Sequence, residues 1–167
     1  DVDETPWGDE AAAAYVRRLA RAKAEAGQAS YAGGRLPVLA ADTTVVLDGA
    51  LLGKPRDERE ARAMLTRLAG RRHQVLTGVA LIDRHGAIVD AVVVTEVEFR
   101  PLTAREIAAY VASGEPADKA GAYGIQGLGG ALVVRLDGSY SNVVGLPLTE
   151  TALLLADAGI AHALNPG

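Results

Sequence analysis

The chain contains no cysteine, which excludes disulfide bonds, cysteine-ligated zinc and thiolate catalysis. Aromatic residues make up only 4% of the sequence, with one Trp and one Phe, so the core must rely on aliphatic side chains. The same scarcity argues against a stacked-aromatic platform for nucleic acid. No apolar run approaches the roughly 18 residues of a membrane span, and no signal peptide is visible. We therefore expect a cytoplasmic protein that binds neither nucleic acid nor membranes.

An excess of positive charge is also missing. The 17 Lys and Arg residues stand against 21 Asp and Glu residues, which gives a formal net charge of -4. No global field would attract a polyanion. A ligand with phosphates would therefore need local lysines and a metal ion to neutralise it.

The common catalytic motifs are absent. There is neither a Gly-x-x-x-x-Gly-Lys-Ser/Thr phosphate loop nor a Gly-x-Ser-x-Gly nucleophile elbow. The glycine-rich stretch 121–130 does not pass from a strand into a helix, so a turn is favoured over a dinucleotide fingerprint. His73, His85 and His162 have no partner at ligand spacing, and we expect all three at the surface.

Hydrophobic periodicity and capping residues predict the elements of one domain of 167 residues. Helices are expected over 9–26, 57–68, 103–112 and 148–158. Strands are expected over 36–41, 44–47, 74–83, 87–99 and 132–136, with a hairpin turn at 84–86. Strands and helices do not alternate strictly, which favours an α/β or α+β domain with a mixed sheet.

Four charged residues occupy unusual places. Glu4 lies in an acidic opening, Asp42 at the end of a predicted strand and Lys54 before a proline. Lys23 is on the apolar side of the first helix, where a lysine snorkelling from the edge is the preferred interpretation of the helix alone. Each residue alone is more typical of a structural role. Together they supply what phosphoryl chemistry needs, namely carboxylates for a divalent cation and cations for phosphate oxygens.

Five runs in order along the chain resemble a known family. They are ADT at 41–43, GKP at 53–55, TGV at 77–79, DKAGAYGIQG at 118–127 and SYSNVVGLP at 139–147. These runs closely resemble the Maf family of nucleotide pyrophosphatases, and the likeness covers essentially the whole chain. One run would be suggestive, whereas five with compatible spacing leave little room for an unrelated mixed α/β domain.

The resemblance implies a fold and a reaction. Maf proteins are similar to the inosine triphosphate pyrophosphatases, with an elongated mixed sheet, flanking helices and two lobes around a cleft. The implied reaction is hydrolysis between the α and β phosphates with Mg²⁺ or Mn²⁺. Asp42 matches the family's proposed proton acceptor, and Glu4, Lys23 and Lys54 match its acidic and basic cleft residues. Glu4 and Asp42 are the expected metal ligands, and whether Asp42 acts as the base or mainly as a ligand is open.

Further positions bear on the substrate. Thr43 and Gln126 match positions that separate the dTTP and UTP branch from the branch that prefers 7-methyl-GTP, and Thr43 fits the pyrimidine branch. Lys119 and Asn142 lie in the family runs without a derived role. For Lys119, contact with phosphate and pairing with Asp118 are both open. Asn142 is equally suited to holding a turn through hydrogen bonds and to touching a ligand.

The family opens with a strand and a Ser-x-Ser-Pro-Arg-Arg loop that supplies a phosphate-binding arginine, and this chain begins after them. We therefore expect a single Maf-like domain over 1–167 that lacks this strand and loop. The resemblance also implies a homodimer. Two functional alternatives are a non-catalytic nucleotide-binding regulator linked to septum formation or cell division, and an enzyme for modified pyrimidine triphosphates.

Overall fold

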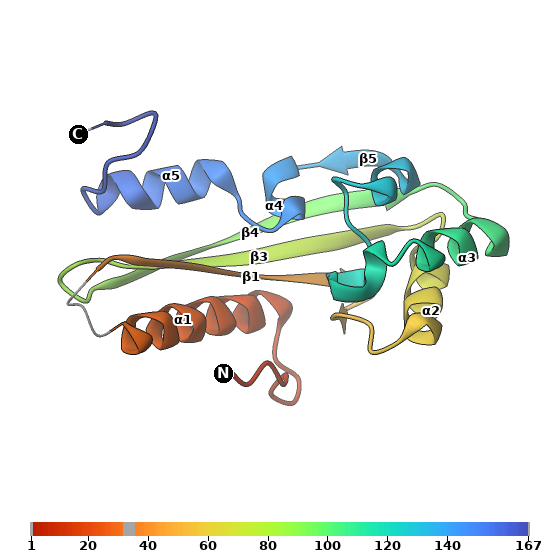
Figure 1. Cartoon of the computed structure of the whole chain (residues 1–167), viewed down its shortest axis with the longest axis horizontal. Coiled ribbons are helices and arrows are strands. Elements are labelled where there is room, and N and C mark those ends of the chain that lie inside the picture. Colours follow the sequence, from red (N-terminus) through yellow and green to blue (C-terminus); the bar gives the residue numbers. More distant parts are fainter. Residues whose placement is uncertain (1, 32–35, 167) are drawn as a thin grey trace.

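A long antiparallel sheet is the spine of the molecule (Figure 1). The computed structural model describes residues 2–31 and 36–166. The strands are β1 (Val38–Leu47), β2 (Ala50–Leu52), β3 (Arg72–Ile82), β4 (Ile88–Phe99) and β5 (Val133–Asp137), in the order β2-β1-β3-β4-β5. The expected elongated sheet with flanking helices is confirmed. Every strand pairing among the described residues is antiparallel, so the parallel pairings that a mixed sheet would also contain are not seen there.

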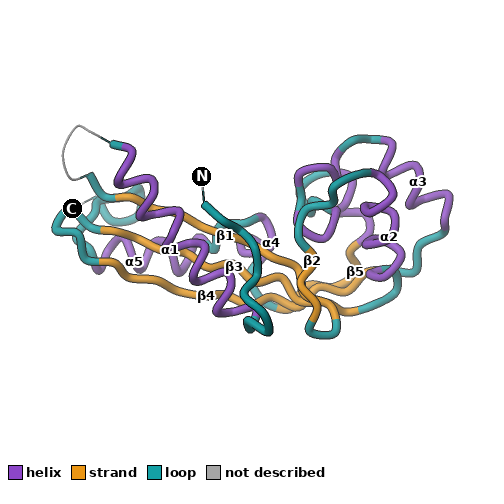
Figure 2. The backbone as a smooth tube through the Cα atoms, turned by 90° about the horizontal axis from the view of Figure 1, so that it is seen from below, coloured by secondary structure: helices purple, strands orange, loops and turns teal. Residues whose placement is uncertain are grey.

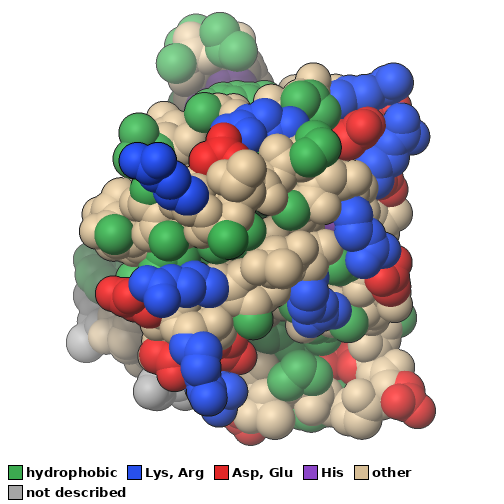
Figure 3. Space-filling view, turned by 90° about the vertical axis from the view of Figure 1, so that its right-hand side faces the viewer, with side chains coloured by type: hydrophobic (Ala, Val, Ile, Leu, Met, Phe, Trp, Pro, Cys, Tyr) green, Lys and Arg blue, Asp and Glu red, His purple; other side chains and the backbone are tan. Residues whose placement is uncertain are grey.

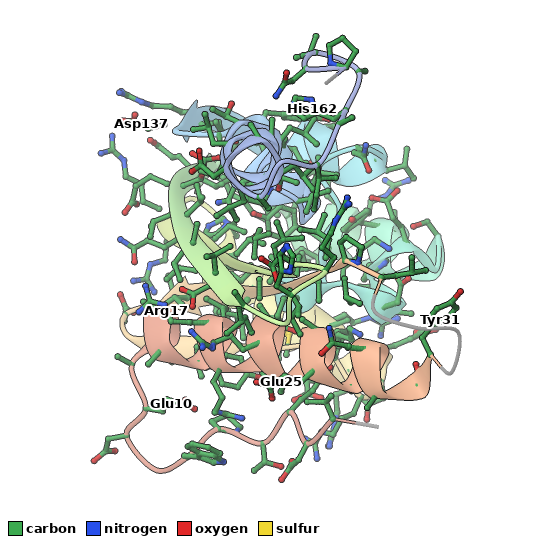
Figure 4. The ribbon with its side chains drawn as sticks, turned by 90° about the vertical axis from the view of Figure 1, so that its left-hand side faces the viewer. Glu10, Arg17, Glu25, Tyr31, Asp137 and His162 are labelled. Carbon is green, nitrogen blue, oxygen red and sulfur yellow. The ribbon has the colours of Figure 1, made fainter. Side chains whose placement is uncertain are left out.

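The sheet is covered on both faces and extended at one end. Helix α1 (Ala12–Ser30) crosses one face, while α4 (Tyr140–Val144) and α5 (Leu148–Asp157) lie on the other. The end-on view shows these three layers, with α1 and α5 on opposite sides of the strands (Figure 4). A smaller lobe holds α2 (Glu58–Leu68), α3 (Ala104–Ala112) and three short 3-10 helices, at 115–118, 120–122 and 128–132 (Figure 2).

Buried apolar residues divide in the same way. The largest cluster joins the end lobe to the sheet and contains Leu65, Leu68 and Phe99. Smaller clusters under α1 are built around Ala20 and Val16. The two parts of the molecule therefore have separate apolar anchors, with the sheet running between them.

Capping chemistry explains the helix boundaries that the sequence predicts well. The Asp57 side chain accepts a hydrogen bond from Glu60 N at 2.7 Å at the start of α2. A capping box of Thr103 and Glu106 opens α3, as predicted. The predicted hairpin is also confirmed, because Asp83 Oδ1 accepts from two amides of the turn between β3 and β4, at 2.8 Å each.

Two local predictions are wrong. Helix α1 begins at Ala12, not at 9, and continues through Gly27 to Ser30, because one glycine costs a helix only about 1 kcal/mol and burial offsets this. The predicted strands 36–41 and 44–47 are one strand, β1, so Asp42 lies in the middle of a strand and not at its end. No helix in the described residues is long and apolar enough to cross a membrane.

Candidate active site

A cavity of about 550 Å³ lies where the sheet meets the end lobe. This volume is within the range of small-molecule sites. All seven side chains singled out from the sequence line it: Glu4, Lys23, Asp42, Thr43, Lys54, Lys119 and Gln126. The fold therefore brings together residues that are up to 122 positions apart in the chain (126 minus 4).

One lysine bridges two carboxylates on the sheet side of the cleft. Lys23 Nζ lies 2.6 Å from Asp42 Oδ1 and 2.7 Å from Glu4 Oε1. The Asp42 side chain is only 9% exposed, whereas that of Glu4 is 48% exposed. Lys23 is thus not a lysine that merely snorkels to water. The Tyr15 hydroxyl donates to the Glu4 carbonyl at 2.9 Å and so connects the N-terminal segment to α1.

Close packing of α1 on the sheet explains how Lys23 reaches Asp42. Gly78 pairs with Asp42 in the β1–β3 register, and a Cβ on Gly78 would overlap the carbonyl of Val16 in α1. Only glycine allows the helix backbone to approach so closely. Lys23 lies seven residues, or two helical turns, beyond Val16, and helical side chains lean towards the helix N-terminus. Its ammonium is therefore brought back over Asp42.

The two carboxylates differ in acidity because their surroundings differ. Burial is the largest influence on Asp42 and raises the pKa of its carboxyl, although the hydrogen bond from Lys23 opposes this. The hydrogen bond from Lys23 lowers the pKa of Glu4. Burial disfavours the charge of Lys23, but its hydrogen bonds to both carboxylates outweigh burial and raise its pKa. The pKa of Asp42 is thus above that of an ordinary aspartate, and the pKa of Glu4 is below that of an ordinary glutamate.

Lys54 provides the second cation of the cleft. It is exposed and follows β2, in a segment tied to the end lobe by the bond from Gly121 N to Gly53 O at 3.0 Å. Within residues 2–31 and 36–166, no carboxylate lies within ion-pair distance of Lys54. Its positive charge lowers the pKa values of Glu4 and Asp42, as a minor contribution in each case. Lys54 therefore remains available for an anionic ligand.

Lys119 occupies the end-lobe side of the cleft, and its ammonium donates to Asp118 Oδ1 at 2.6 Å. Both side chains are exposed. Of the two interpretations of Lys119, pairing with its neighbour is thus observed. Figure 3 looks onto this end of the molecule, where basic and acidic side chains are interspersed.

Thr43 belongs to a neutral hydrogen-bond network on the opposite face of β1. Its Oγ1 lies 2.8 Å from Thr77 Oγ1, and Thr77 Oγ1 donates to the Asn142 carbonyl at 3.1 Å. Asn142 is fully buried and its Nδ2 donates to Val75 O and to Thr95 Oγ1. Asn142 is therefore a structural residue that joins α4 to the sheet, and its side chain neither holds a turn nor lines the cleft.

The network favours one direction for the Thr43 hydrogen bond. A hydroxyl has one proton, and that of Thr77 is directed to the Asn142 carbonyl, which can only accept. Either hydroxyl of the Thr43–Thr77 pair could be the donor, and when Thr77 donates to Asn142, Thr43 donates to Thr77. In that arrangement the Thr43 hydroxyl, which lines the cleft, can only accept from a ligand.

His73 is not at the surface, contrary to the prediction. It lies in β3 with 2% of its surface exposed, and its Nε2 is 2.8 Å from the hydroxyl of Tyr123, a cleft-lining residue. Burial lowers the pKa of His73 to about 4, so the ring is neutral at pH 7. Phe99 and Tyr123 pack edge-on against it. His73 does not line the cavity itself, but it supports Tyr123, which does.

Sequence reasoning missed Glu115, which lines the cleft next to the segment of Gln126. Its carboxylate accepts hydrogen bonds from Leu128 N at 2.8 Å and Gly129 N at 3.0 Å. Closely spaced glycines at 127, 129 and 130 indicate close backbone approach, but nothing in the local pattern identifies the group approached.

Glu4 and Asp42 are the two carboxylates of the cleft that share the Lys23 ammonium. Among the described residues, no group of three or more acidic or histidine side chains is arranged to hold a metal ion. However, oxygens of Glu4 and Asp42 both contact the Lys23 ammonium, so they already converge on one positive charge. Mg²⁺ is commonly bound by one or two carboxylates together with substrate phosphates. The donor set therefore fits a metal shared with a triphosphate.

Comparison with known proteins identifies the family of the chain. A family model described as Maf-like protein matches residues 1–158. The chain belongs to the Maf family. A dTTP/UTP pyrophosphatase of Myxococcus xanthus is 59% identical over 160 residues, which are 96% of this chain and 80% of the relative. The corresponding values for a dTTP/UTP pyrophosphatase of Escherichia coli are 58% over 157 residues, 93% and 78%. A nucleoside triphosphate pyrophosphatase of Shigella flexneri is 56% identical over 156 residues, with 93% and 78% coverage.

The family assignment confirms the resemblance drawn from the five runs. Four of the five runs contribute residues to the cleft lining, and the TGV run at 77–79 does not line it. The Lys23, Asp42 and Lys54 side chains come from α1, β1 and the segment after β2. Their chemistry exists only once the sheet is formed.

Proposed function

We propose that this Maf protein is a nucleoside triphosphate pyrophosphatase that hydrolyses dTTP and UTP to the monophosphate and pyrophosphate. The observation that carries the proposal is the pair of carboxylates bridged by Lys23, with Lys54 facing the same cleft. The activity for which the similar pyrophosphatases are named supports the same reaction. A cytoplasmic homodimer, implied by composition and family, stays a prediction.

Asp42 is the proposed general base. The oxygen of water forms a bond to the α-phosphorus while the bond from that phosphorus to the α–β bridging oxygen breaks, and pyrophosphate leaves. Asp42 accepts the proton that the water loses, a role favoured by its burial and its raised pKa. Lys23 and Lys54 offset negative charge on the phosphate oxygens as it moves to the leaving group.

A divalent cation, Mg²⁺ or Mn²⁺, is part of the same proposal. Glu4 and Asp42 would hold it, since their oxygens already converge on a cation. When bound, such an ion neutralises phosphate charge and polarises the scissile bond. Glu4 would serve mainly as a ligand because its lowered pKa keeps it charged at neutral pH.

Thr43 and Gln126 are the proposed readers of the base. Because the Thr43 hydroxyl offers lone pairs to the cleft, it can accept a hydrogen bond from the N3–H group of uracil or thymine. Cytosine has no hydrogen at N3 and would place one acceptor against another. Gln126 can both donate and accept across the cleft. We therefore expect a preference for dTTP and UTP over CTP.

A pyrophosphate-release assay with dTTP, UTP, CTP and 7-methyl-GTP tests the proposal, with Mg²⁺, Mn²⁺ or a chelator. We expect metal-dependent turnover that is fastest on dTTP and UTP. Asp42→Asn should lower kcat by roughly 100- to 10,000-fold, the usual contribution of a general base. Wild-type turnover in this variant would contradict the role of Asp42, and absence of release from every nucleotide would favour a non-catalytic regulator.

Asp90→Asn is the matched control for Asp42→Asn. Asp90 is also a mostly buried strand carboxylate, 12% exposed, and it too is paired with α1, at 2.8 Å from Arg17 Nε and 2.6 Å from Arg21 Nη1. Arg17 is labelled in Figure 4, on the α1 side of the sheet. Asp90 does not line the cleft. The control should lose some stability and keep its turnover, so that a loss specific to Asp42 reports on chemistry.

A further inference from the structure

The segment that carries Gln126 is folded around one carboxylate. Glu115 Oε1 accepts from the hydroxyl of Tyr110 at 2.7 Å and from Gly129 N at 3.0 Å, while Oε2 accepts from Leu128 N at 2.8 Å. The Tyr110 hydroxyl in turn accepts from Gly124 N at 3.1 Å. Both ends of segment 124–129 are therefore bound to the same pair of side chains, with Gln126 between the two attachment points.

Glycines make this wrapping possible. A Cβ on Gly127 would overlap the Glu115 carboxylate, and a Cβ on Gly129 would lie 2.6 Å from the Tyr110 hydroxyl oxygen. A Cβ on Gly130 would lie 2.7 Å from the Ile125 carbonyl oxygen. The segment is thus packed against Glu115 and Tyr110 without space for a methyl group, so its path depends on the position of those two side chains.

Glu115 has little freedom to serve another purpose. Its two oxygens accept three hydrogen bonds, which leaves it poorly placed to become a metal ligand like Glu4. Burial works against its charge, but the bonds from Gly129, Tyr110 and Leu128 outweigh burial and lower its pKa. A charged acceptor makes stronger hydrogen bonds to amides than a neutral one. Glu115 is therefore suited to holding backbone.

We propose that Glu115, supported by Tyr110, is a positioning residue that holds Gln126 in place and thereby sets the discrimination between pyrimidine bases. The proposal rests on the proposed function, in which Gln126 contacts the base. Glu115 and Tyr110 take no part in the proposed phosphate chemistry, which is assigned to Asp42, Lys23 and Lys54 on other elements. Loss of the clamp should therefore weaken substrate binding and selectivity while largely sparing the chemical step.

Glu115→Gln is the first test variant, because it keeps the shape of the side chain. Its amide group would present hydrogens to the Leu128 or Gly129 N–H, so donors would face donors. Amides of residues 124–130 should exchange with deuterium faster than in wild type. KM for UTP should rise roughly tenfold with kcat within about threefold of wild type, and the preference for UTP over CTP should fall.

Two further variants support the interpretation. Tyr110→Phe removes one hydroxyl that makes two of the contacts, and it should shift exchange, KM and selectivity in the same direction by a smaller factor. Glu106→Gln is the matched control, since Glu106 also accepts from backbone at the capping box of α3 but does not line the cleft. This control should leave exchange at 124–130, KM and selectivity unchanged.

Several outcomes would overturn the proposal. Unchanged exchange at 124–130 in Glu115→Gln would show that the carboxylate does not hold the segment. Faster exchange with unchanged KM and unchanged selectivity would show that the segment does not position a base reader. Equal effects in Glu106→Gln would assign the change to general destabilisation.

A separate measurement keeps this proposal distinct from the proposed function. Binding of the α,β-methylene analogues of UTP and CTP can be followed by calorimetry, because they are not cleaved at the proposed bond. If wild type hydrolyses no triphosphate, the proposed function fails in the release assay alone. Weaker and less selective analogue binding in Glu115→Gln would still support the clamp, and unchanged binding would overturn it.

Discussion

The two faces of β1 carry different kinds of polar chemistry within one strand. Asp42 faces α1 and joins an ion-paired group with Lys23 and Glu4 that is partly open to water. Thr43, its neighbour, faces α4 and joins a neutral network whose inner members, Thr77 and Asn142, are fully buried. Alternate side chains of a strand point to opposite faces, so one residue step separates the two environments.

The difference has a physical consequence. Lys23 and Glu4 are partly exposed, so their charges can be rearranged around a ligand at lower cost than buried groups, because water screens them. In a buried neutral network, any group left unpaired costs the folded state the full desolvation free energy of that group. We therefore expect substitutions on the Asp42 face to alter mainly turnover, and substitutions on the Thr43 face to alter mainly stability and base selection.

Removal of the bridging cation should have the largest effect. In Lys23→Met, Asp42 and Glu4 would face each other without a counter-charge, and the phosphates would lose a cation. We expect kcat to fall roughly 100-fold or more, measured as pyrophosphate release with UTP. Arg21→Met is the control, because Arg21 also projects from α1 but pairs with Asp90 outside the cleft. Equal losses of kcat in both variants would show that the Asp42 face of β1 has no special role in turnover.

The buried network should respond through stability. Asn142→Leu would leave the Val75 carbonyl and Thr95 Oγ1 each without one donor. It also removes an Oδ1 that has no partner among the described residues, which offsets part of the loss. We expect the free energy of unfolding to fall by about 2–3 kcal/mol in denaturant titrations.

Thr151→Val is the control for this loss. Thr151 is also buried, but its hydroxyl has no hydrogen-bond partner among the described residues. Its replacement by a group of similar shape should be near neutral or stabilising. A stability loss in Thr151→Val that matched that of Asn142→Leu would show that buried polarity as such, and not the network, is responsible.

The sequence predicted the elements far better than the packing between them. Helix caps such as Asp57 and Thr103 are local, so the boundaries of α2 and α3 follow from a few neighbouring residues. The start of α1 and the continuity of β1 depend on burial against each other, which no local pattern records. The surface prediction for His73 failed for the same reason, since its ring packs against Phe99 and Tyr123 while the neighbouring side chains of Arg72 and Gln74 are exposed on the other face.

The candidate site shows the same division. The family runs identified residues that do line one cleft, although their catalytic and binding roles stay predictions. The Lys23 bridge could not be derived from α1 alone, because it depends on how closely Gly78 lets the helix approach. Glu115 was missed because its partners are backbone amides, which have no sequence signature.

The direction of the Thr43 hydrogen bond gives a smaller and sharper prediction. Thr77→Val keeps the shape of a side chain that does not line the cleft, but removes the acceptor for the Thr43 proton. Thr43 could then donate towards the cleft, as cytosine N3 requires. We expect the ratio of kcat/KM for UTP over CTP to fall by roughly five- to tenfold, with kcat for UTP little changed. An unchanged ratio would show that the Thr43–Thr77 hydrogen bond does not influence base selection.

The smallest expected effect is a shift in the acid limb of the pH–rate profile. Asp42 must be ionised to act as a base, and its pKa is raised above the ordinary 3.8, so activity should be lost as pH falls through that raised value. The Glu4 charge contributes to the rise, so Glu4→Gln should move the limb to lower pH, whereas Lys23→Met should move it to higher pH. Profiles with one substrate compare the variants directly, because ionisation of the triphosphate is common to all of them.

The same profiles test the other face of β1. Thr43, Thr77 and Asn142 do not titrate in this range, and His73 is neutral well above its pKa of about 4. The preference for UTP over CTP should therefore stay constant over the pH range in which cytosine N3 is unprotonated, while kcat falls on the acid side. Within that range, selectivity that declined together with kcat would mean that the two faces of β1 share one ionisation, and the separation between chemistry and base selection would be lost.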